Sequence, residues 1–292
     1  FLPEKVLLYT VKPVIYGSLA ARGLGIDVYS MITGAGYSFT TSGIKQAVIS
    51  SVVRRMYRLA LAGNQAVVFQ NPDDLQLFFG HNLLRSDIPR HCVNGSGVDT
   101  QYFYPTTLPE EPVFLLIARL LKDKGIREYV AAAREVRKSY PHARFLLLGA
   151  FDPNPAAISE EEIKAWHKEG IVEYLGTTED VRPVLSRARF YVLPSYYREG
   201  VPRTVLEAMS MGRPIITTDA PGCRETVVPG KNGYLVPPRD SSKLAKAMIS
   251  MLQDSEKAEK MGETSRERAL AIFDVGRVNR QMLQIMEIDR EA

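Results

Sequence analysis

The segment that decides the fold is residues 190–211, which read FYVLPSYYREGVPRTVLEAMSM. Its first four residues, Phe190–Leu193, form a short apolar run that predicts a buried β-strand. The run breaks at Gly200 and Pro202, and a helical pattern follows over residues 204–211. The order is therefore strand, loop and helix N-terminus. Free backbone amides and the positive end of the helix dipole attract a phosphate group at such a place, and Gly200 lets a ligand approach the backbone closely.

Two glutamates flank this turn: Glu199 lies in the loop, and Glu207 lies two turns into the helix. The Glu199 carboxylate can accept hydrogen bonds from sugar hydroxyls, and Glu207 can bind a ribose diol through both of its oxygens. Two other pairs of glutamates share this spacing, but they fall in charged helical stretches. The context of a strand-to-helix turn therefore singles out the pair at 199 and 207.

A second loop, further upstream, carries positive charge directly after an apolar run. Residues 113–118 predict a strand, and Arg119, Lys124 and Gly125 follow it before a helical stretch. Parallel sheets bind ligands at the carboxyl ends of their strands, where Arg119 and Lys124 can neutralise a diphosphate. From charge alone, a solvated basic loop is the open alternative.

The rest of the chain alternates short apolar runs with amphipathic stretches, as parallel strands and their crossover helices do. The first series predicts strands at residues 6–10, 27–33 and 66–70, and the second at 113–118, 144–149, 172–176, 190–193 and 214–217. Three prolines mark a linker between the two series, over residues 102–112. The predicted fold class is therefore α/β, with two Rossmann-like, doubly wound domains.

We expect a first domain over residues 1–105, a second over 106–273, and a C-terminal helix over 274–292 that packs back on the first domain. The first series has fewer strands than a doubly wound sheet normally contains, and the chain opens without an initiator methionine. The first domain is therefore expected to be incomplete.

Composition and short motifs exclude several classes. The 292 residues carry 37 Lys and Arg against 33 Asp and Glu, a net charge of +4 that is too mild to indicate nucleic acid. Cys92 and Cys223 are too few for a disulfide framework, which favours the reducing cytoplasm. No apolar run reaches the roughly 18–20 residues that a bilayer span needs. The P-loop and the Gly-x-Ser-x-Gly elbow are absent, and the four histidines lack metal-ligand spacing.

Taken together, the quoted residues resemble the retaining GT-B glycosyltransferases of family 4. The resemblance covers the second domain nearly end to end. It includes Arg119 with Lys124 and Gly125, Leu175-Gly176, Leu193-Pro194-Ser195, Glu199-Gly200-Val201-Pro202-Arg203, Glu207-Ala208-Met209 and Pro221-Gly222-Cys223-Arg224-Glu225. Gly97-Val98-Asp99 is similar to the family's run into its linker. The amino-acid sequence at residues 196–203 and 222–225 is most similar to that of bacterial members that extend lipid-linked oligosaccharides for surface polysaccharide or glycoprotein assembly.

The resemblance implies a role for each matching residue. Arg119 and Lys124 would hold the diphosphate and stabilise the leaving group, Glu199 would meet the donor sugar, and Glu207 would take the ribose. The further donor contacts implied are Gly200, Val201, Pro202, Arg203 and Leu206, with the base near Tyr174 and Gly176. The acceptor hydroxyl of such enzymes attacks the face that the nucleotide leaves, and neither a metal nor a cofactor is expected.

By resemblance to the substrates that family members use, we expect UDP as the nucleotide, a hexose or N-acetylhexosamine as the sugar, and a polyprenyl-diphosphate-linked saccharide as the acceptor. Two features depart from the family. The glycine-rich turn after its first strand has no counterpart here, and Gly34-Ala35-Gly36 stands where many members have a histidine that contacts the donor sugar. These departures bear on activity and on the choice of sugar.

One helical stretch, residues 44–62, is both basic and amphipathic. A helical wheel places apolar residues on one face and three arginines opposite; the apolar residues are Val48, Ile49, Val52, Val53, Met56, Leu59 and Ala60, and the arginines are Arg54, Arg55 and Arg58. The arginines predict contact with an anionic membrane, as a polyprenyl-linked acceptor would require. The alternative is an ordinary crossover helix with its apolar face in the core and its arginines in water.

The expected protein is therefore a cytoplasmic glycosyltransferase, peripheral at the inner face of the plasma membrane, that binds a nucleotide-sugar and a glycan acceptor but no nucleic acid. A noncatalytic fragment or subunit that only binds the nucleotide-sugar is the alternative. A nicotinamide dehydrogenase is disfavoured because the glycine fingerprint for dinucleotides is missing.

Overall fold

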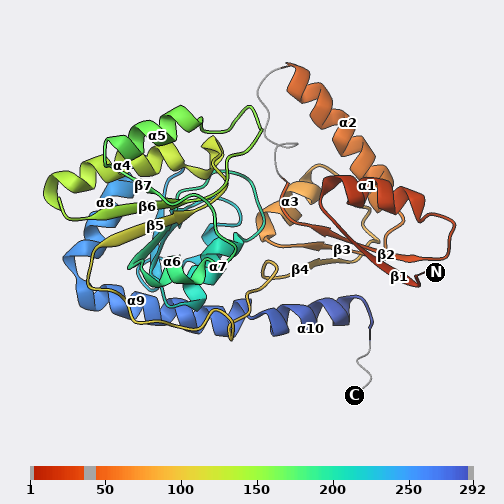
Figure 1. Ribbon diagram of the computed structural model, residues 1–292. Helices are drawn as coiled ribbons and strands as arrows, with labels where there is room; N and C mark the ends of the chain where they lie inside the picture. The colour runs from red at the N-terminus through yellow and green to blue at the C-terminus, as the bar shows by residue number, and fades with distance from the viewer. Residues whose placement is uncertain (1–2, 36–43, 289–292) are drawn as a thin grey trace. The chain divides into compact units, whose positions relative to one another are not determined.

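The computed structural model of the chain describes residues 3–35 and 44–288 (Figure 1). The chain forms two compact units. Unit 1 comprises Phe1–Gly97, Arg198–Pro202 and Val275–Ala292, and unit 2 comprises Val98–Tyr197 and Arg203–Asp274. The first division of the chain thus falls before the proline-rich linker that the sequence indicates.

Unit 1 is built on a four-stranded parallel sheet in the order β1-β2-β3-β4. The strands are β1 (Lys5–Tyr9), β2 (Asp27–Ile32), β3 (Ala66–Phe69) and β4 (Arg90–Cys92). Three helices complete the unit's first layer: α1 (Val11–Ala20), α2 (Ile44–Leu61) and α3 (Pro72–Gly80). Their buried side chains, among them Val14, Tyr57 and Phe78, pack with Val67 and Phe69 of β3.

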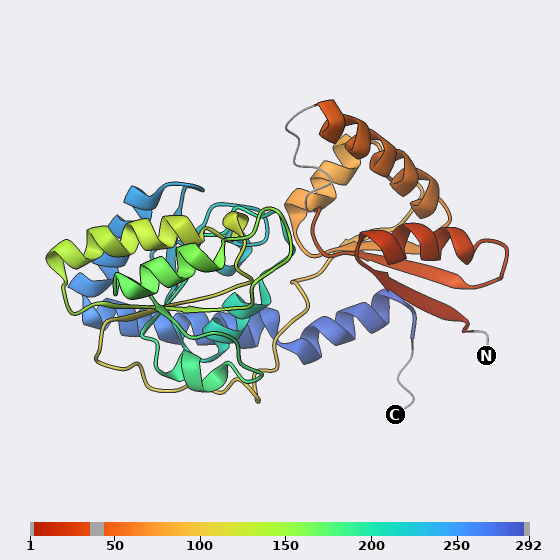
Figure 2. The same ribbon diagram turned by 45° about the horizontal axis from the view of Figure 1, so that its top comes forward.

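The opposite face of this sheet is covered by helix α10 (Val275–Ile285). Because side chains alternate along a strand, Ala66 and Val68 point away from the first three helices and meet Met282 and Met286 instead. The Lys5 ammonium donates to the Met286 carbonyl oxygen at 2.6 Å and so satisfies the end of the helical segment. Figure 2 shows α10 lying along the sheet on the side away from α1.

Unit 2 contains a six-stranded parallel sheet in the order β10-β9-β8-β5-β6-β7. The strands are β5 (Val113–Ile117), β6 (Arg144–Leu148), β7 (Glu173–Tyr174), β8 (Phe190–Leu193), β9 (Ile215–Thr218) and β10 (Gly233–Val236). Its α-helices are α4 (Ile126–Ser139), α5 (Glu160–Lys168), α6 (Arg182–Ser186), α7 (Arg203–Ser210), α8 (Ser241–Gln253) and α9 (Ser255–Arg268). Shorter helical turns are η2 (Lys122–Lys124), η3 (Arg224–Thr226) and η4 (Ala269–Phe273).

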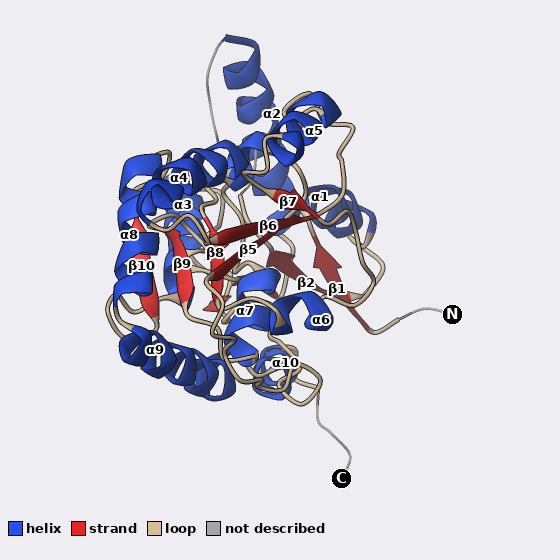
Figure 3. Ribbon diagram, turned by 60° about the vertical axis from the view of Figure 1, so that its left-hand side comes forward, coloured by secondary structure: helices blue, strands red, loops and turns tan. Residues whose placement is uncertain are grey.

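The strand order reverses between β5 and β8, which lie side by side although β6 and β7 come between them in the chain. Ligands of open α/β sheets bind outside the carboxyl ends of the strands at such a reversal. Helices α4 and α8 cover one face of the sheet and α6 and α7 the other (Figure 3). The residues after β5 and β8 therefore lie where a ligand site is expected.

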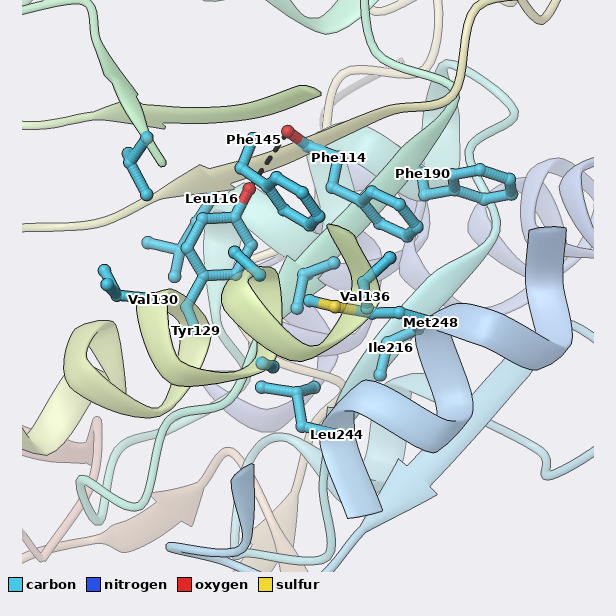
Figure 4. Close-up of a cluster of buried hydrophobic side chains, with 14 of the residues drawn as sticks. Phe114, Leu116, Tyr129, Val130, Val136, Phe145, Phe190, Ile216, Leu244 and Met248 are labelled. Carbon is cyan, nitrogen blue, oxygen red and sulfur yellow. Dashed lines mark hydrogen bonds between the residues drawn. The ribbon is translucent and has the colours of Figure 1, made fainter. Parts of the chain in front are cut away.

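The core of unit 2 is aromatic where β5, β6 and β8 meet. The ring of Phe114 stacks on those of Phe145 and Phe190, with centroids 5.3 and 4.7 Å apart (Figure 4). The buried Tyr129 hydroxyl of α4 donates to the Phe114 carbonyl oxygen at 3.0 Å, so burying this polar group leaves it satisfied. This packing makes the sheet a rigid base for the loops at its edge.

Both units are parallel α/β, so the predicted fold class is confirmed for the described residues. Caps match the helix starts: Asn71 accepts from the Asp74 amide at the start of α3, and Asp240 accepts from the Lys243 amide at the start of α8. Among the described residues, no helix is both long and apolar enough to cross a bilayer.

Candidate functional site

Two loops at the carboxyl edge of the unit 2 sheet are tied into one structure. The Asp123 carbonyl oxygen, in the loop after β5, accepts hydrogen bonds from the Tyr196 and Tyr197 amides at 2.9 and 3.0 Å. It also accepts from the Ser195 hydroxyl at 3.3 Å. The loop after β8 therefore fixes the loop that carries Lys124.

Gly125 sets the path of the chain directly after Lys124. Its φ of +75° lies in the left-handed region, and a Cβ at this position would stand 2.1 Å from the Pro194 carbonyl oxygen. Only glycine meets both conditions. Lys124 is almost buried, with 9% of the residue exposed, and its Nζ lies 5.3 Å from the centroid of the Tyr197 ring. A cation held this way is pre-oriented for an anionic ligand.

Arg119 is the more exposed cation of the pair. Its Nη1 donates to the Asp152 Oδ2 at 2.8 Å, and 59% of the Arg119 side chain is exposed against 13% for Asp152. Asp152 lies in the loop after β6, the strand next to β5. The sequence pattern alone did not single out Asp152, although an acidic residue just past a neighbouring strand is a recognisable signal.

Helix α7 begins beside the end of β5 because two hydroxyls anchor it there. The hydroxyls of Tyr191 and Thr204 lie 2.7 Å apart, and they lie 3.2 and 3.3 Å from the Ile117 carbonyl oxygen. Thr204 occupies the first turn of α7, and Ile117 is the last residue of β5. The N-terminus of α7 is thus held at Ile117, which precedes Arg119 by two positions in the chain.

Glu207 is a buried carboxylate on α7, with 7% of the residue exposed. Burial raises its pKa above the ordinary value, and the neighbouring Arg203 opposes that rise. The Arg203 Nε lies 3.1 Å from the Glu207 Oε1, while 72% of the Arg203 side chain is exposed. An exposed, movable arginine therefore pairs with a fixed carboxylate, which can accept two hydrogen bonds from a diol.

Tyr174, the last residue of β7, and Gly176, two residues further along the chain, lie at the same edge of the sheet. The Tyr174 hydroxyl donates to the Gly149 carbonyl oxygen at 2.9 Å, and the Gly149 amide donates to the Gly176 carbonyl oxygen at 2.8 Å. A Cβ on Gly149 would stand 1.8 Å from the Ala118 carbonyl oxygen, directly before Arg119. The ends of β5, β6 and β7 therefore converge.

Unit 2 accordingly brings six of the predicted site residues to one sheet edge or to the helix that follows it: Arg119, Lys124, Tyr174, Gly176, Arg203 and Glu207. Leu206 is fully buried in α7, so its side chain packs in the interior.

The four remaining residues of the motif, Glu199, Gly200, Val201 and Pro202, belong to unit 1. There the Gly200 amide donates to the Thr33 carbonyl oxygen at 2.8 Å, and Val201 lies against Gly95.

The basic helix α2 differs from the alternative expectation of an ordinary crossover helix with its apolar face in the core. Tyr57, Ala60 and Leu61 are buried, but Val48, Ile49, Val52 and Leu59 are each more than half exposed. Arg58 donates through Nε to the Asn82 carbonyl oxygen at 2.8 Å and through Nη2 to that of His81 at 3.3 Å. The expectation that the whole apolar face lies in the core is therefore wrong, because the buried face of α2 is rotated toward Tyr57.

Comparison with known proteins agrees with this geometry. Residues 111–254 match the family model described as glycosyl transferases group 1. A curated relative from Campylobacter jejuni, an N,N'-diacetylbacillosaminyl-diphospho-undecaprenol alpha-1,3-N-acetylgalactosaminyltransferase, is 28% identical over 259 residues, which cover 83% of this chain and 66% of the relative. The chain spans between about half and two thirds of the length of the first curated relatives that it matches.

Solved structures share the fold. Sucrose-phosphate synthase from Thermosynechococcus elongatus superposes with a TM-score of 0.83 at 24% identity, over 97% of this chain and 73% of that one. Anabaena HepE in complex with UDP gives 0.82 at 20% identity, over 96% and 78%. The GT-B resemblance drawn from the sequence is confirmed at the level of the fold, and residues 111–254 are similar to the glycosyl transferases group 1 family.

Proposed function

We propose that this protein is a retaining glycosyltransferase that moves a hexosyl or N-acetylhexosaminyl group from a UDP-sugar to a saccharide carried on a polyprenyl diphosphate. One observation carries the proposal. Two cations and a buried carboxylate, Arg119, Lys124 and Glu207, line the carboxyl edge of one parallel sheet beside its reversal point. This edge lies within the part of the chain that matches the family model.

Each of these side chains binds a different part of the nucleotide-sugar donor. Arg119 and Lys124 take the two phosphates, the Glu207 carboxylate accepts the 2′ and 3′ hydroxyls of the ribose, and the base lies near Tyr174 and Gly176. Arg203 leaves Glu207 when the ribose arrives, which its exposure allows. Backbone amides at the start of α7 add positive potential.

The chemical step needs charge stabilisation more than a strong base. The acceptor oxygen bonds to the anomeric carbon while the bond from that carbon to the diphosphate oxygen breaks on the same face. The acceptor proton passes to the departing phosphate oxygen. Arg119 and Lys124 stabilise the negative charge that grows on the leaving diphosphate, the role that a divalent cation fills in other transferases. Glu199 holds the hydroxyls of the donor sugar during transfer.

Two similarities support the substrates. The structural neighbour HepE is described in complex with UDP. The name of the Campylobacter relative includes diphospho-undecaprenol, a polyprenyl carrier. For this chain, the exposed apolar and basic side chains of α2 support association with an anionic membrane, and we place the protein at the cytoplasmic face of the plasma membrane.

The test of the proposal joins binding to transfer. We expect a thermal-shift panel of nucleoside diphosphates and their sugars to select UDP, because a ligand at 100 times its Kd stabilises the fold by about 2.7 kcal/mol. Transfer from the selected UDP-sugar to a polyprenyl-diphosphate saccharide is then followed with and without EDTA, and we expect equal rates.

The matched variants are Glu207→Ala and Glu161→Ala, the second an exposed glutamate of α5. Glu207→Ala should weaken UDP binding and Glu161→Ala should not. An inactive Glu207→Ala enzyme with unchanged UDP affinity would contradict the ribose role. Binding of UDP-sugar by the wild type with no transfer to any acceptor would favour the noncatalytic alternative instead.

A further inference from the structure

The loop that carries Glu199 packs closely against the segments of unit 1 that follow β2 and β3. Gly34 has a φ of +126°, and a Cβ there would stand 2.7 Å from the Glu199 Cα. A Cβ on Gly200 would stand 1.9 Å from the Gln70 Oε1. The absence of both side chains lets the Glu199–Gly200 backbone lie directly on the segments after β2 and β3.

A buried carboxylate, that of Asp74, contacts the residue directly before Glu199. Asp74, in the first turn of α3, is fully buried and receives hydrogen bonds from three segments of unit 1. Its Oδ1 accepts from the Arg198 Nε at 2.8 Å, and its Oδ2 accepts from the Asn71 Nδ2 at 3.0 Å and the Ala35 amide at 3.3 Å. A carboxylate without water needs such partners, so Asp74 holds Arg198 strongly in place.

Asn71 extends the same network to Glu199 itself. This fully buried side chain donates through Nδ2 to the Glu199 carbonyl oxygen at 3.2 Å. Its Oδ1 accepts from the Asp74 amide at 2.8 Å. Asp74 therefore holds the Arg198 side chain, and Asn71 holds the Glu199 carbonyl group, on either side of the peptide that joins the two residues.

We propose that Asp74 is a positioning residue for glycosyl transfer: through Arg198 and Asn71, it holds the loop that presents the Glu199 carboxylate to the donor sugar. The inference rests on the proposed function. If Asp74 served only to cap α3, its hydrogen bonds would stay within the start of that helix. Instead, the hydrogen bonds of Asp74 and its neighbours Asp73 and Asn71 extend to Arg198 and Glu199. This network acts on the donor sugar and leaves the hold of Glu207 on the ribose unchanged, because Glu207 belongs to unit 2.

The experiment compares Asp74→Asn with Asp87→Asn, whose wild-type carboxylate also pairs with an arginine of unit 1 but is exposed. Asparagine at 74 turns an amide N–H toward the Arg198 donor, so we expect kcat for the UDP-sugar to fall roughly 10- to 100-fold, as misplacement of a group by about 1 Å does. The Kd for UDP should stay within about twofold, because the ribose and diphosphate contacts remain. Asp87→Asn should change neither quantity.

Two further variants separate positioning from folding. Arg198→Lys keeps a cation that reaches Asp74 and should retain most of kcat, whereas Arg198→Gln should lose as much as Asp74→Asn. Arg198 is partly exposed, so Arg198→Gln provides the same kinetic comparison if Asp74→Asn does not fold. In a Glu199→Gln background, Asp74→Asn should cause no further loss, because the two residues act as one unit.

Each outcome supports or contradicts the positioning role of Asp74. Equal losses of kcat from Asp74→Asn in the wild-type and Glu199→Gln backgrounds would overturn the positioning role, and so would an unchanged kcat in both Asp74→Asn and Arg198→Gln. A wild-type enzyme that transfers no sugar overturns the proposed function and this inference together. A wild type that transfers sugar beside variants that behave as the control overturns this inference alone.

Discussion

At the scale of single residues, the burial of Glu207 makes UDP binding depend on pH in a defined direction. Burial raises the pKa of this carboxyl, yet the ribose contact needs the ionised form. UDP affinity should therefore fall as the pH is lowered, and the fall should begin at a higher pH than for a solvated glutamate. Calorimetric titration of UDP across the acid range measures this.

The stability contribution of Glu207 runs in the opposite direction. Since its folded pKa lies above the unfolded one, its contribution is greatest below the unfolded pKa and is lost as the pH rises through the raised pKa. Glu207→Gln should remove both trends, leaving weak binding that no longer varies with pH through this group. A Glu207→Gln variant that keeps the wild-type pH profile of binding would assign the profile to another group.

Arg119 allows a prediction about charge. Its guanidinium is largely exposed, so the ion pair with Asp152 contributes on the order of 1 kcal/mol, and a diphosphate can displace Asp152. Removing the guanidinium with Arg119→Ala should weaken UDP binding by about 1.5–3 kcal/mol, as expected for a charge-assisted contact. Arg127→Ala is the matched control, because Arg127 is a similarly exposed arginine paired with Glu162 in the same unit. Equal Kd values for the two variants, measured by calorimetry, would remove Arg119 from the donor site.

The sequence predicted where Arg119, Lys124 and Glu207 lie in the fold, because each follows a strand or occupies the helix after one, and local patterns reveal such places; their roles stay a prediction. It missed Asp152 and Asp74 because their significance comes from partners 33 and 124 residues away. In the sequence, Gly34 stands out only as a departure from the family pattern, because its packing against Glu199 depends on tertiary structure.

At the scale of elements, the predictions succeeded where an element is apolar and flanked by clear breaks. The strand Phe190–Leu193 has the bounds that the sequence indicates. The two strands that the sequence missed, β4 and β10, are edge strands among the described residues, each paired on one side only. The segment Arg90–Cys92 is polar and three residues long, so it carries no strand pattern.

The turn between η2 and α4 allows a prediction about stability. Gly125→Ala combines the left-handed backbone with a clash against the Pro194 carbonyl oxygen, and we expect unfolding to become easier by about 3 kcal/mol. Gly170→Ala is the control: its φ is +72°, but a Cβ would meet nothing within 4 Å, so the loss should be only about 1–2 kcal/mol. Urea unfolding of both variants measures the difference, and equal losses would mean that the two loops are not tightly packed.

Helix α2 allows a prediction about membranes. Ile44–Leu61 contains no acidic residue, and Val48, Val52 and Leu59 lie exposed on it. Replacing these three by serine should weaken binding to vesicles of phosphatidylcholine and phosphatidylglycerol by roughly tenfold or more, because each side chain would lose burial in the lipid interface. Leu24→Ser, an equally exposed leucine of unit 1, should have no effect.

Arg55→Glu should weaken binding only when the vesicles contain the anionic lipid, since its contribution is electrostatic. Cosedimentation measures both effects. Unchanged binding of the triple serine variant would show that α2 does not meet the bilayer, and a shift from dimer to monomer in that variant would assign the apolar strip to a second copy of the chain.

At the scale of the whole molecule, tertiary contacts decide the units more than the linker composition does. The proline-rich segment after Thr100 is held on unit 2 by two arginines. Arg266 Nη1 donates to the carbonyl oxygens of Thr100 and Phe103, and Arg213 donates to those of Thr106 and Thr107. Burial lowers the pKa of Arg213 to about 10. Prolines marked a break in regular structure, but long-range hydrogen bonds fixed which unit the segment joins.

Helix α10 completes unit 1, and this can be tested without disturbing unit 2. Met282 and Met286 of the α10 segment fill the face of the unit 1 sheet, so Met282→Ala with Met286→Ala should cost about 2 kcal/mol each. The single tryptophan, Trp166, lies in α5 of unit 2 and reports that unit alone, while far-ultraviolet circular dichroism follows both. The double variant should lower a melting transition seen by circular dichroism and leave the fluorescence transition in place, and exposed Gln284→Ala should change neither. Equal shifts by both probes would mean that the two units unfold together, because a defect confined to unit 1 cannot otherwise reach Trp166.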